Sequence, residues 1–186
     1  MASEYGRFLY LFIYNRDAFV TSGPEEPWRI EDRYYWSLVT GPSPRDLTRL
    51  GRRWIDRVHE VTKMDARNSR AQMRFVIGEI ADLEALEAIW DTTSTANIGK
   101  TGHAIADWVG AAWERVTGNY IIFREVLSCS WDLLMLTSLM ILEERRAGGF
   151  FDCEDKWKKD NDIILTWDYL RGEWTESLLG GKERVM

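Results

Sequence analysis

Seven consecutive apolar residues near the start of the chain constrain its fold more than any other feature. The run from Phe8 to Tyr14 (FLYLFIY) consists only of aromatic and aliphatic residues and has polar residues on both sides. Since neighbouring side chains of a strand point to opposite faces of a sheet, a run apolar at every position is typical of a strand buried on both faces. It is too short for a bilayer span or a secretory signal core. The sequence therefore predicts a central buried strand over residues 7–14.

Other strands and helices are predicted from the spacing of apolar residues and from the residues that start and stop them. Strands are expected at 34–39, which ends at Gly41-Pro42, at 73–80, and at 163–165 in the tail. Helices are expected from the N-cap Asp82 to about Asp91, over 102–117, and from Ser130 to the cations and glycines at 145–149. In the helix at 102–117, apolar residues recur on one face: Ile105, Trp108, Val109, Ala112, Trp113 and Val116.

The stretch 45–61 is ambiguous between helix and strand. Leu47, Leu50, Trp54, Val58 and Val61 recur at helical spacing, so periodicity favours an amphipathic helix with an arginine-rich outer face. Nine basic and four acidic residues lie between Arg45 and Arg74, and the outer face of such a helix would explain them without a nucleic-acid partner.

Size, charge and cysteine content indicate one acidic domain of a reducing compartment. The 186 residues fit a single domain, 1–186, and the net charge of −6 argues against binding nucleic acid or an anionic membrane with the whole surface. The two cysteines have no metal-site spacing, and the longest apolar stretch, 133–142, is too short for a bilayer. We therefore expect a cytoplasmic protein. The 10 tryptophans either fill the core or line a concave site.

Three local motifs could indicate a catalytic or binding role, but each is explained more simply by a structural one. Gly99-Lys100-Thr101 resembles the end of a phosphate-binding loop, but the first glycine of that motif is replaced by Ser94 and no strand pattern precedes it. His103 and Asp107 are spaced as a solvated helical pair. Cys129 stands at a helix start, where the helix dipole lowers a thiol pKa, but no histidine is near it in sequence.

The order of these elements resembles that of an uncharacterised family of small fungal proteins. The segments that carry the resemblance cover most of the chain and are RYYWSLVTGP at 33–42, RFVIGEIADLE at 74–84, DWVGAA at 107–112, and TWDYL at 166–170. That family in turn resembles the permuted papain-like group of NlpC/P60 hydrolases and lecithin:retinol acyltransferases. The resemblance implies a strand near 55–61, in conflict with the helical periodicity there.

The resemblance also implies that the catalytic pair of the papain-like group is lost. Tyr35 stands where that group has its strand histidine, and Ile105 stands where it has its nucleophilic cysteine. His59 matches a second family histidine. Acyl transfer by this route needs a thiolate and a base in contact, so a Cys–His hydrolase mechanism is not expected.

These observations lead us to expect an α+β domain with a small, mainly antiparallel sheet flanked by helices, papain-like in resemblance. The first functional hypothesis is a cofactor-independent, metal-free enzyme or binder for an apolar small molecule, of an acid/base-assisted isomerisation or cyclisation type. Tyr35 and His59 would then supply acid/base catalysis. Trp36, Ile105 and Trp108 would line the substrate site. The alternative is a non-catalytic interaction module, a pseudo-hydrolase.

Overall fold

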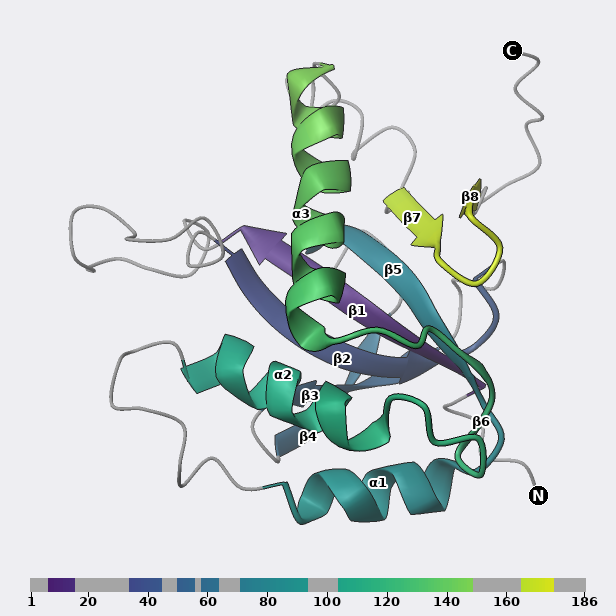
Figure 1. Ribbon diagram of the computed structural model, residues 1–186. Coiled ribbons are helices and arrows are strands. Elements are labelled where there is room, and N and C mark those ends of the chain that lie inside the picture. Colours follow the sequence, from purple (N-terminus) through teal and green to yellow (C-terminus); the bar gives the residue numbers. More distant parts are fainter. Residues whose placement is uncertain are drawn as a thin grey trace.

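The computed structural model describes residues 7–15, 34–44, 50–55, 58–63, 71–93, 104–148 and 165–175. These residues form an α+β fold with an open, mainly antiparallel sheet and three helices (Figure 1). In chain order the elements are β1 (Phe8–Asn15), β2 (Tyr34–Gly41), β3 (Leu50–Ile55), β4 (Val58–Lys63), β5 (Ala71–Ile80), α1 (Leu83–Asp91), α2 (Ala104–Val116), β6 (Phe123–Val126), α3 (Trp131–Ala147), β7 (Leu165–Asp168) and β8 (Glu173–Thr175).

The first strand lies in the middle of the sheet, as its apolar run predicts. The strand order is β4-β3-β2-β1-β5-β7-β8, with β6 also paired to β5. β1 pairs antiparallel with β2 on one side and with β5 on the other. Only the β5–β7 pair among the described strands is parallel. The sheet is larger than expected because it contains three strands, β3, β6 and β8, that the sequence did not predict, and β4, which only the family resemblance implied.

The outer edge of β5 is shared by two strands. β7 pairs with its first half, from Met73 to Val76, and β6 pairs with its second half, from Gly78 to Ile80. The backbone N–H of Tyr169 donates to the Val76 carbonyl at 3.1 Å, and that of Leu127 donates to the Ile77 carbonyl at 3.0 Å. The segments that follow β7 and β6 therefore leave the edge of β5 at two adjacent residues, Val76 and Ile77.

The sheet has two differently covered faces. On the side that we call the helix face, Leu9, Leu11 and Ile13 of β1 pack with buried residues of all three helices. On the side that we call the opposite face, Tyr10, Phe12 and Tyr14 form a second cluster to which no described helix contributes. Each of these six side chains is at most 4% exposed, which confirms that β1 is buried on both faces.

Two helix starts are capped by side chains, at Asp82, which was the predicted cap, and at Ser130, which was predicted only as the start of a helix. The Asp82 carboxylate accepts a hydrogen bond from the Ala85 backbone N–H at 3.0 Å, and the Ser130 hydroxyl accepts from the Leu133 N–H at 3.3 Å. These bonds satisfy backbone donors that the first turn of a helix leaves without a partner. None of the described helices is long and apolar enough to cross a membrane.

The predicted inward face of α2 is also confirmed where the structure describes it. Five side chains of that face are fully buried: Trp108, Val109, Ala112, Trp113 and Val116. The side chain of Ile105 and the whole of His103 lie outside the described residues, so the solvated pair predicted for His103 and Asp107 is not tested.

The helix predicted by periodicity at 45–61 is wrong. Within this stretch the structure forms the β3–β4 hairpin, in which Trp54 pairs with His59 and Arg52 with Val61. A hairpin of two strands joined by a two-residue connection places apolar residues at intervals of three and four, which imitates a helical spacing. Residues 45–49 and 56–57 lie outside the described residues. The strand near 55–61 that the family resemblance implies is thus present as β4.

The C-terminal strands differ in length and number from the prediction. β7 begins at Leu165, the last residue of the strand predicted at 163–165, and the other two residues lie outside the described part.

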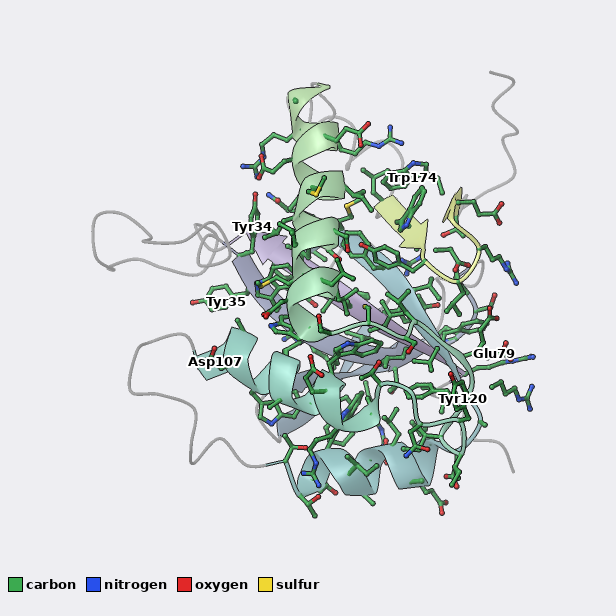
Figure 2. All side chains as sticks on the ribbon, in the orientation of Figure 1. Tyr34, Tyr35, Glu79, Asp107, Tyr120 and Trp174 are labelled. Atoms are coloured by element: carbon green, nitrogen blue, oxygen red, sulfur yellow. The ribbon has the colours of Figure 1, made fainter. Side chains whose placement is uncertain are left out.

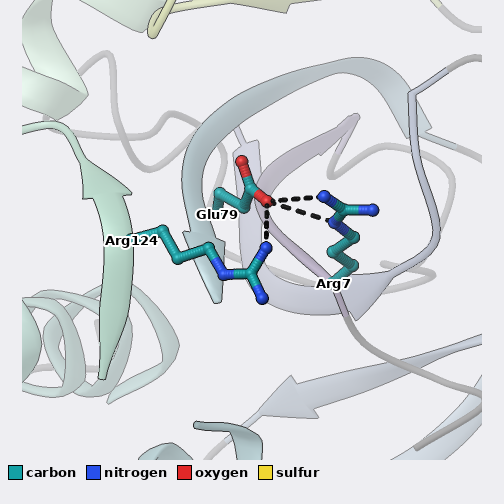
Figure 3. A network of polar contacts seen from close by, with 3 residues as sticks. All are labelled: Arg7, Glu79 and Arg124. Carbon is teal, nitrogen blue, oxygen red and sulfur yellow. Dashed lines mark hydrogen bonds and ion pairs between the residues drawn. The ribbon is translucent and has the colours of Figure 1, made fainter. Parts of the chain in front are cut away.

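At the far end of β5, Glu79 accepts hydrogen bonds from Arg7 at 3.1 Å and from Arg124 of β6 at 3.4 Å (Figure 3). Since both arginine side chains are more than 60% exposed, this network adds little stability.

Candidate functional site

Tyr35 and Trp36, two of the predicted site residues, point to opposite faces of the sheet because they are consecutive in β2. Trp36 is 1% exposed and belongs to the core of the helix face. Tyr35 is partly buried and packs against the aromatic cluster of the opposite face. The structure therefore separates the predicted acid/base tyrosine from two of the residues expected to surround it, Trp36 and Trp108.

His59 lies in β4, two strands away from β2. It pairs in register with Trp54, and Trp54 pairs with Leu38, a core residue of the helix face. Residues directly opposite each other in a sheet share a face, so the position of His59 belongs to the helix face and that of Tyr35 to the opposite face. The backbone register therefore does not place the two predicted catalytic positions on one face of the sheet, and the side chain of His59 lies outside the described residues.

Of the two predicted binding residues of α2, Trp108 belongs to a series of indole rings. Ile105 is in the first turn of α2, one turn before Trp108, which is fully buried. The Trp108 ring lies 6.5 Å from that of Trp90, which in turn lies 5.4 Å from that of Trp54. The Nε1 atom of Trp90 donates to the Ala112 carbonyl at 3.3 Å, whereas the buried Nε1 atom of Trp108 has no hydrogen-bond partner in the structure.

A further tryptophan, predicted from the sequence as an inward-facing helix residue but not as a site residue, packs between α2 and β2. The ring of Trp131, the first residue of α3, contacts the ring of Trp36 edge-on at 5.6 Å. The same ring lies so close to Gly110 of α2 that a Cβ at residue 110 would meet it at 2.6 Å. Glu114 of α2 accepts a hydrogen bond from the Trp131 backbone N–H and so anchors the start of α3 against α2.

Cys129 is a poor candidate for a nucleophile. It lies just before α3 and forms no disulfide. Burial raises the pKa of its thiol above the ordinary value of 9.0, and the nearby carboxylate of Glu114 raises it further. The helix-start effect that favours a thiolate is therefore outweighed, and the neutral thiol predominates at physiological pH.

A hydroxyl cluster next to Cys129 ties β7 to α3. The Tyr169 hydroxyl donates to Thr137 at 3.1 Å and lies 3.1 Å from the hydroxyl of Ser138, which is fully buried. Burial raises the pKa of Tyr169, and the bonds to Ser138 and Thr137 lower it by less. The phenol therefore stays protonated and acts as a hydrogen-bond donor, which suits a structural link better than a base.

The sequence analysis missed a polar cluster at the start of β2. Tyr34, 4% exposed, donates from its hydroxyl to Glu143 of α3 at 2.6 Å. Arg146 donates to Gln72 of β5 at 3.3 Å and lies 5.7 Å from the centre of the Tyr34 ring. Tyr34 and Tyr35 lie at the same end of β2 (Figure 2), but the tyrosine that meets a helix is Tyr34. The i, i+3 spacing of Glu143 and Arg146 was the available signal.

The opposite face carries two arginines over tyrosine rings. Arg74, fully buried, lies 5.4 Å from the centre of the Tyr10 ring, and Arg53 lies 5.6 Å from that of Tyr14. Arg74 also donates to the Thr166 hydroxyl and, at 3.3 Å, to the Pro44 carbonyl. Burial lowers the pKa of Arg74 to about 10.

The expected arginine-rich outer face of a helix at 45–61 is therefore also wrong. Arg52 and Arg53 are strand residues, and Arg52 reaches Glu87 of α1 at 2.8 Å. Arg52 thus contacts α1, and Arg53 lies over a tyrosine ring of β1. Among the described residues, no three His, Cys, Asp or Glu side chains gather closely enough to hold a metal ion.

Comparison with known proteins identifies a family to which the chain is similar. The model of a family of unknown function (DUF6914) matches residues 7–175. No curated protein and no solved structure matches the chain.

Proposed function

The chain belongs to this family of unknown function (DUF6914), and we propose that it is a non-catalytic interaction module, a pseudo-hydrolase on a degenerate papain-like scaffold. The observation that carries the proposal is the position of Trp131. Its ring contacts both Trp36 of β2 and Gly110 of α2, the strand and the helix on which the resemblance places the positions of the lost histidine and cysteine. Because the Trp131 side chain packs between these two elements, we place the recognition of a partner on the surface of the molecule.

The ionisation of the described polar groups supports the same proposal. The Cys129 thiol has a raised pKa, and the Tyr169 phenol beside it stays protonated. Nucleophilic catalysis needs the reverse arrangement, a lowered thiol pKa and a base in hydrogen-bond contact. The small number of cysteines and the acidic charge remain our reasons for proposing a cytoplasmic location.

A second candidate function is supported by one atom. The Nε1 donor of Trp108 is buried and finds no partner among the residues that the structure describes, and such a donor costs about 1–3 kcal/mol of stability. A bound molecule with a carbonyl or ether oxygen would relieve this cost. The cofactor-independent enzyme or binder for an apolar small molecule therefore stays as the alternative, with Trp108, Trp36 and the neighbouring Ile105 as its binding residues.

The reactivity of Cys129 tests the first proposal. In a Cys153→Ser variant only Cys129 remains, so the rate of its alkylation by iodoacetamide can be followed against pH. We expect the rate to keep rising beyond pH 9.0, because the thiol pKa is above that value. A rate that levels off near neutral pH, together with ester or thioester hydrolysis that Cys129→Ser abolishes, would overturn the pseudo-hydrolase.

The small-molecule alternative is tested separately by native mass spectrometry of the purified chain. A copurified apolar compound that is present in the wild type and absent in Trp108→Phe would favour the alternative. Because phenylalanine keeps an aromatic ring but lacks the Nε1 donor, the comparison isolates the hydrogen bond. Wild-type protein of the mass of the bare chain supports the interaction module.

A further inference from the structure

Three large apolar side chains form a stripe along the outward side of α3. Leu133, Leu136 and Met140 are 51%, 54% and 63% exposed. Their spacing of three and four residues places them above one another on one side of the helix. The buried residues Leu134, Leu139 and Leu142 occupy the other side and face the sheet. α3 is thus apolar on two sides, and among the described residues the sheet and the other helices pack against one of them.

The charges around this stripe are all negative. Asp132 precedes Leu136 by one turn and Glu144 follows Met140 by one turn, and both are exposed. Neither forms an ion pair in the part of the chain that the structure describes. Glu143 lies beside them, with Arg146 at 3.8 Å on its inner side.

The two cations at the end of α3 are turned toward the sheet. The guanidinium of Arg145 lies 4.1 Å from the centre of the Trp174 ring of β8, and Arg146 reaches Gln72 of β5. Both arginines thereby leave the outward side of the helix. The stripe is framed by carboxylates at both ends without a described cation between them.

From this arrangement we propose that the outward side of α3 is a docking surface for a basic amphipathic helix of a partner protein. The inference rests on the proposed function as an interaction module and names its surface and partner chemistry. A helix with leucine-type residues on one face would cover the stripe, and lysines or arginines at its ends would meet Asp132 and Glu144. Met140 suits such a contact because its unbranched side chain adapts to different partners.

Charge disfavours two other occupants. A second copy that packs α3 antiparallel on α3, with Leu136 facing Met140, places Asp132 of one copy opposite Glu144 of the other. Two carboxylates so placed repel each other. An anionic membrane is repelled by the same carboxylates.

The test uses the full chain and a labelled synthetic peptide of about 18 residues, with leucine on one helical face and lysine on the other. Binding is measured by fluorescence anisotropy for the wild type and for Leu136→Lys and Met140→Lys. The matched control is Ile121→Lys, because Ile121 is 80% exposed in the turn before β6 and the substitution changes the net charge equally. Circular dichroism verifies that each variant is folded.

We expect Leu136→Lys and Met140→Lys to weaken peptide binding at least ~10-fold and Ile121→Lys to change it less than about twofold. Equal weakening by all three variants would mean that net charge alone attracts the peptide, and would overturn the proposal. So would tighter binding of a leucine–glutamate peptide, adsorption to phosphatidylserine vesicles, or self-association that Met140→Lys abolishes. If the wild type binds no peptide while Cys129 stays unreactive, the docking surface fails and the pseudo-hydrolase stands.

Discussion

Gly110 of α2 leaves room for the ring of Trp131 of α3 because glycine has no side chain. A Cβ at residue 110 would meet the Trp131 ring at 2.6 Å. Because that ring also contacts Trp36, moving it away from residue 110 would disturb its packing on the core. We expect Gly110→Ala to lower the free energy of unfolding by about 1–3 kcal/mol, measured by urea denaturation.

Gly148 provides the matched control for that prediction. It ends α3 with an ordinary φ of −74°, and a Cβ there would find its nearest neighbours at 3.5 and 3.6 Å. Gly148→Ala should leave the free energy of unfolding within about 0.5 kcal/mol of the wild type. If both substitutions cost the same, the contact of Gly110 with Trp131 is not the cause.

The bond from Tyr34 to Glu143 is expected to stabilise the attachment of α3 to the sheet. Tyr34→Phe removes the donor and Glu143→Gln removes the charge of the acceptor, and each should lower the free energy of unfolding by about 1 kcal/mol. The Glu143 side chain is 36% exposed, so we expect no larger effect. The double variant should cost less than the sum of the two single ones. Strict additivity in this cycle would show that the two groups do not interact.

Burial of Tyr14 makes stability fall at alkaline pH. Burial raises the pKa of this phenol above its ordinary value of 10.0, although the bond from Ser37 and the charge of Arg53 lower it. Above that pH the unfolded chain loses the proton while the folded chain keeps it, so the free energy of unfolding decreases as pH rises. The stabilisation is complete below pH 10.0.

Tyr14→Phe removes this dependence, and the measurement is urea denaturation of both proteins between about pH 8 and about pH 11. The wild type should lose stability faster than the variant above pH 10.0. Arg74, whose pKa is lowered to about 10, acts in the opposite direction, but it is present in both proteins and cancels in their difference. Parallel curves for the two proteins would contradict the prediction.

Two arginines in different surroundings should respond differently to lysine. Arg74 is fully buried and donates to both Thr166 and Pro44, a geometry that a lysine does not reproduce. We expect Arg74→Lys to cost about 3 kcal/mol in the free energy of unfolding. Arg124, 63% exposed in its pairing with Glu79, should tolerate the same change within about 0.5 kcal/mol. Similar losses at the two sites in thermal unfolding would exclude a special role for Arg74.

The sequence predicts those elements whose signal is local. β1 follows from an unbroken apolar run, and α1 follows from Asp82, whose side chain caps the helix as expected. The start of α3 was predicted near Ser130, whose side chain also caps its helix. The β3–β4 hairpin was missed because its pairing depends on contacts between strands, such as Trp54 with His59, which a one-dimensional spacing does not contain. β6 and β8, with four and three residues, are too short to show alternation.

The candidate site was harder to predict because β2 is buried on both faces. When both faces are apolar, alternation no longer shows which residue faces the helices. The sequence singled out Tyr35, whereas the tyrosine that reaches a helix is Tyr34. The role of Trp131 depends on Gly110, a residue 21 positions earlier whose missing side chain makes the space, and only the fold brings the two together.

The divided edge of β5 has a consequence for how the chain folds during synthesis. Its second half can pair with β6 soon after the helices α1 and α2 have formed, but its first half must wait for β7. Arg74 and Thr166, neighbours across that junction, are 92 residues apart in sequence. Until the ribosome has released β7, the first half of β5 has unpaired backbone groups along this edge, which another strand could pair with, so the full sheet forms only late in synthesis.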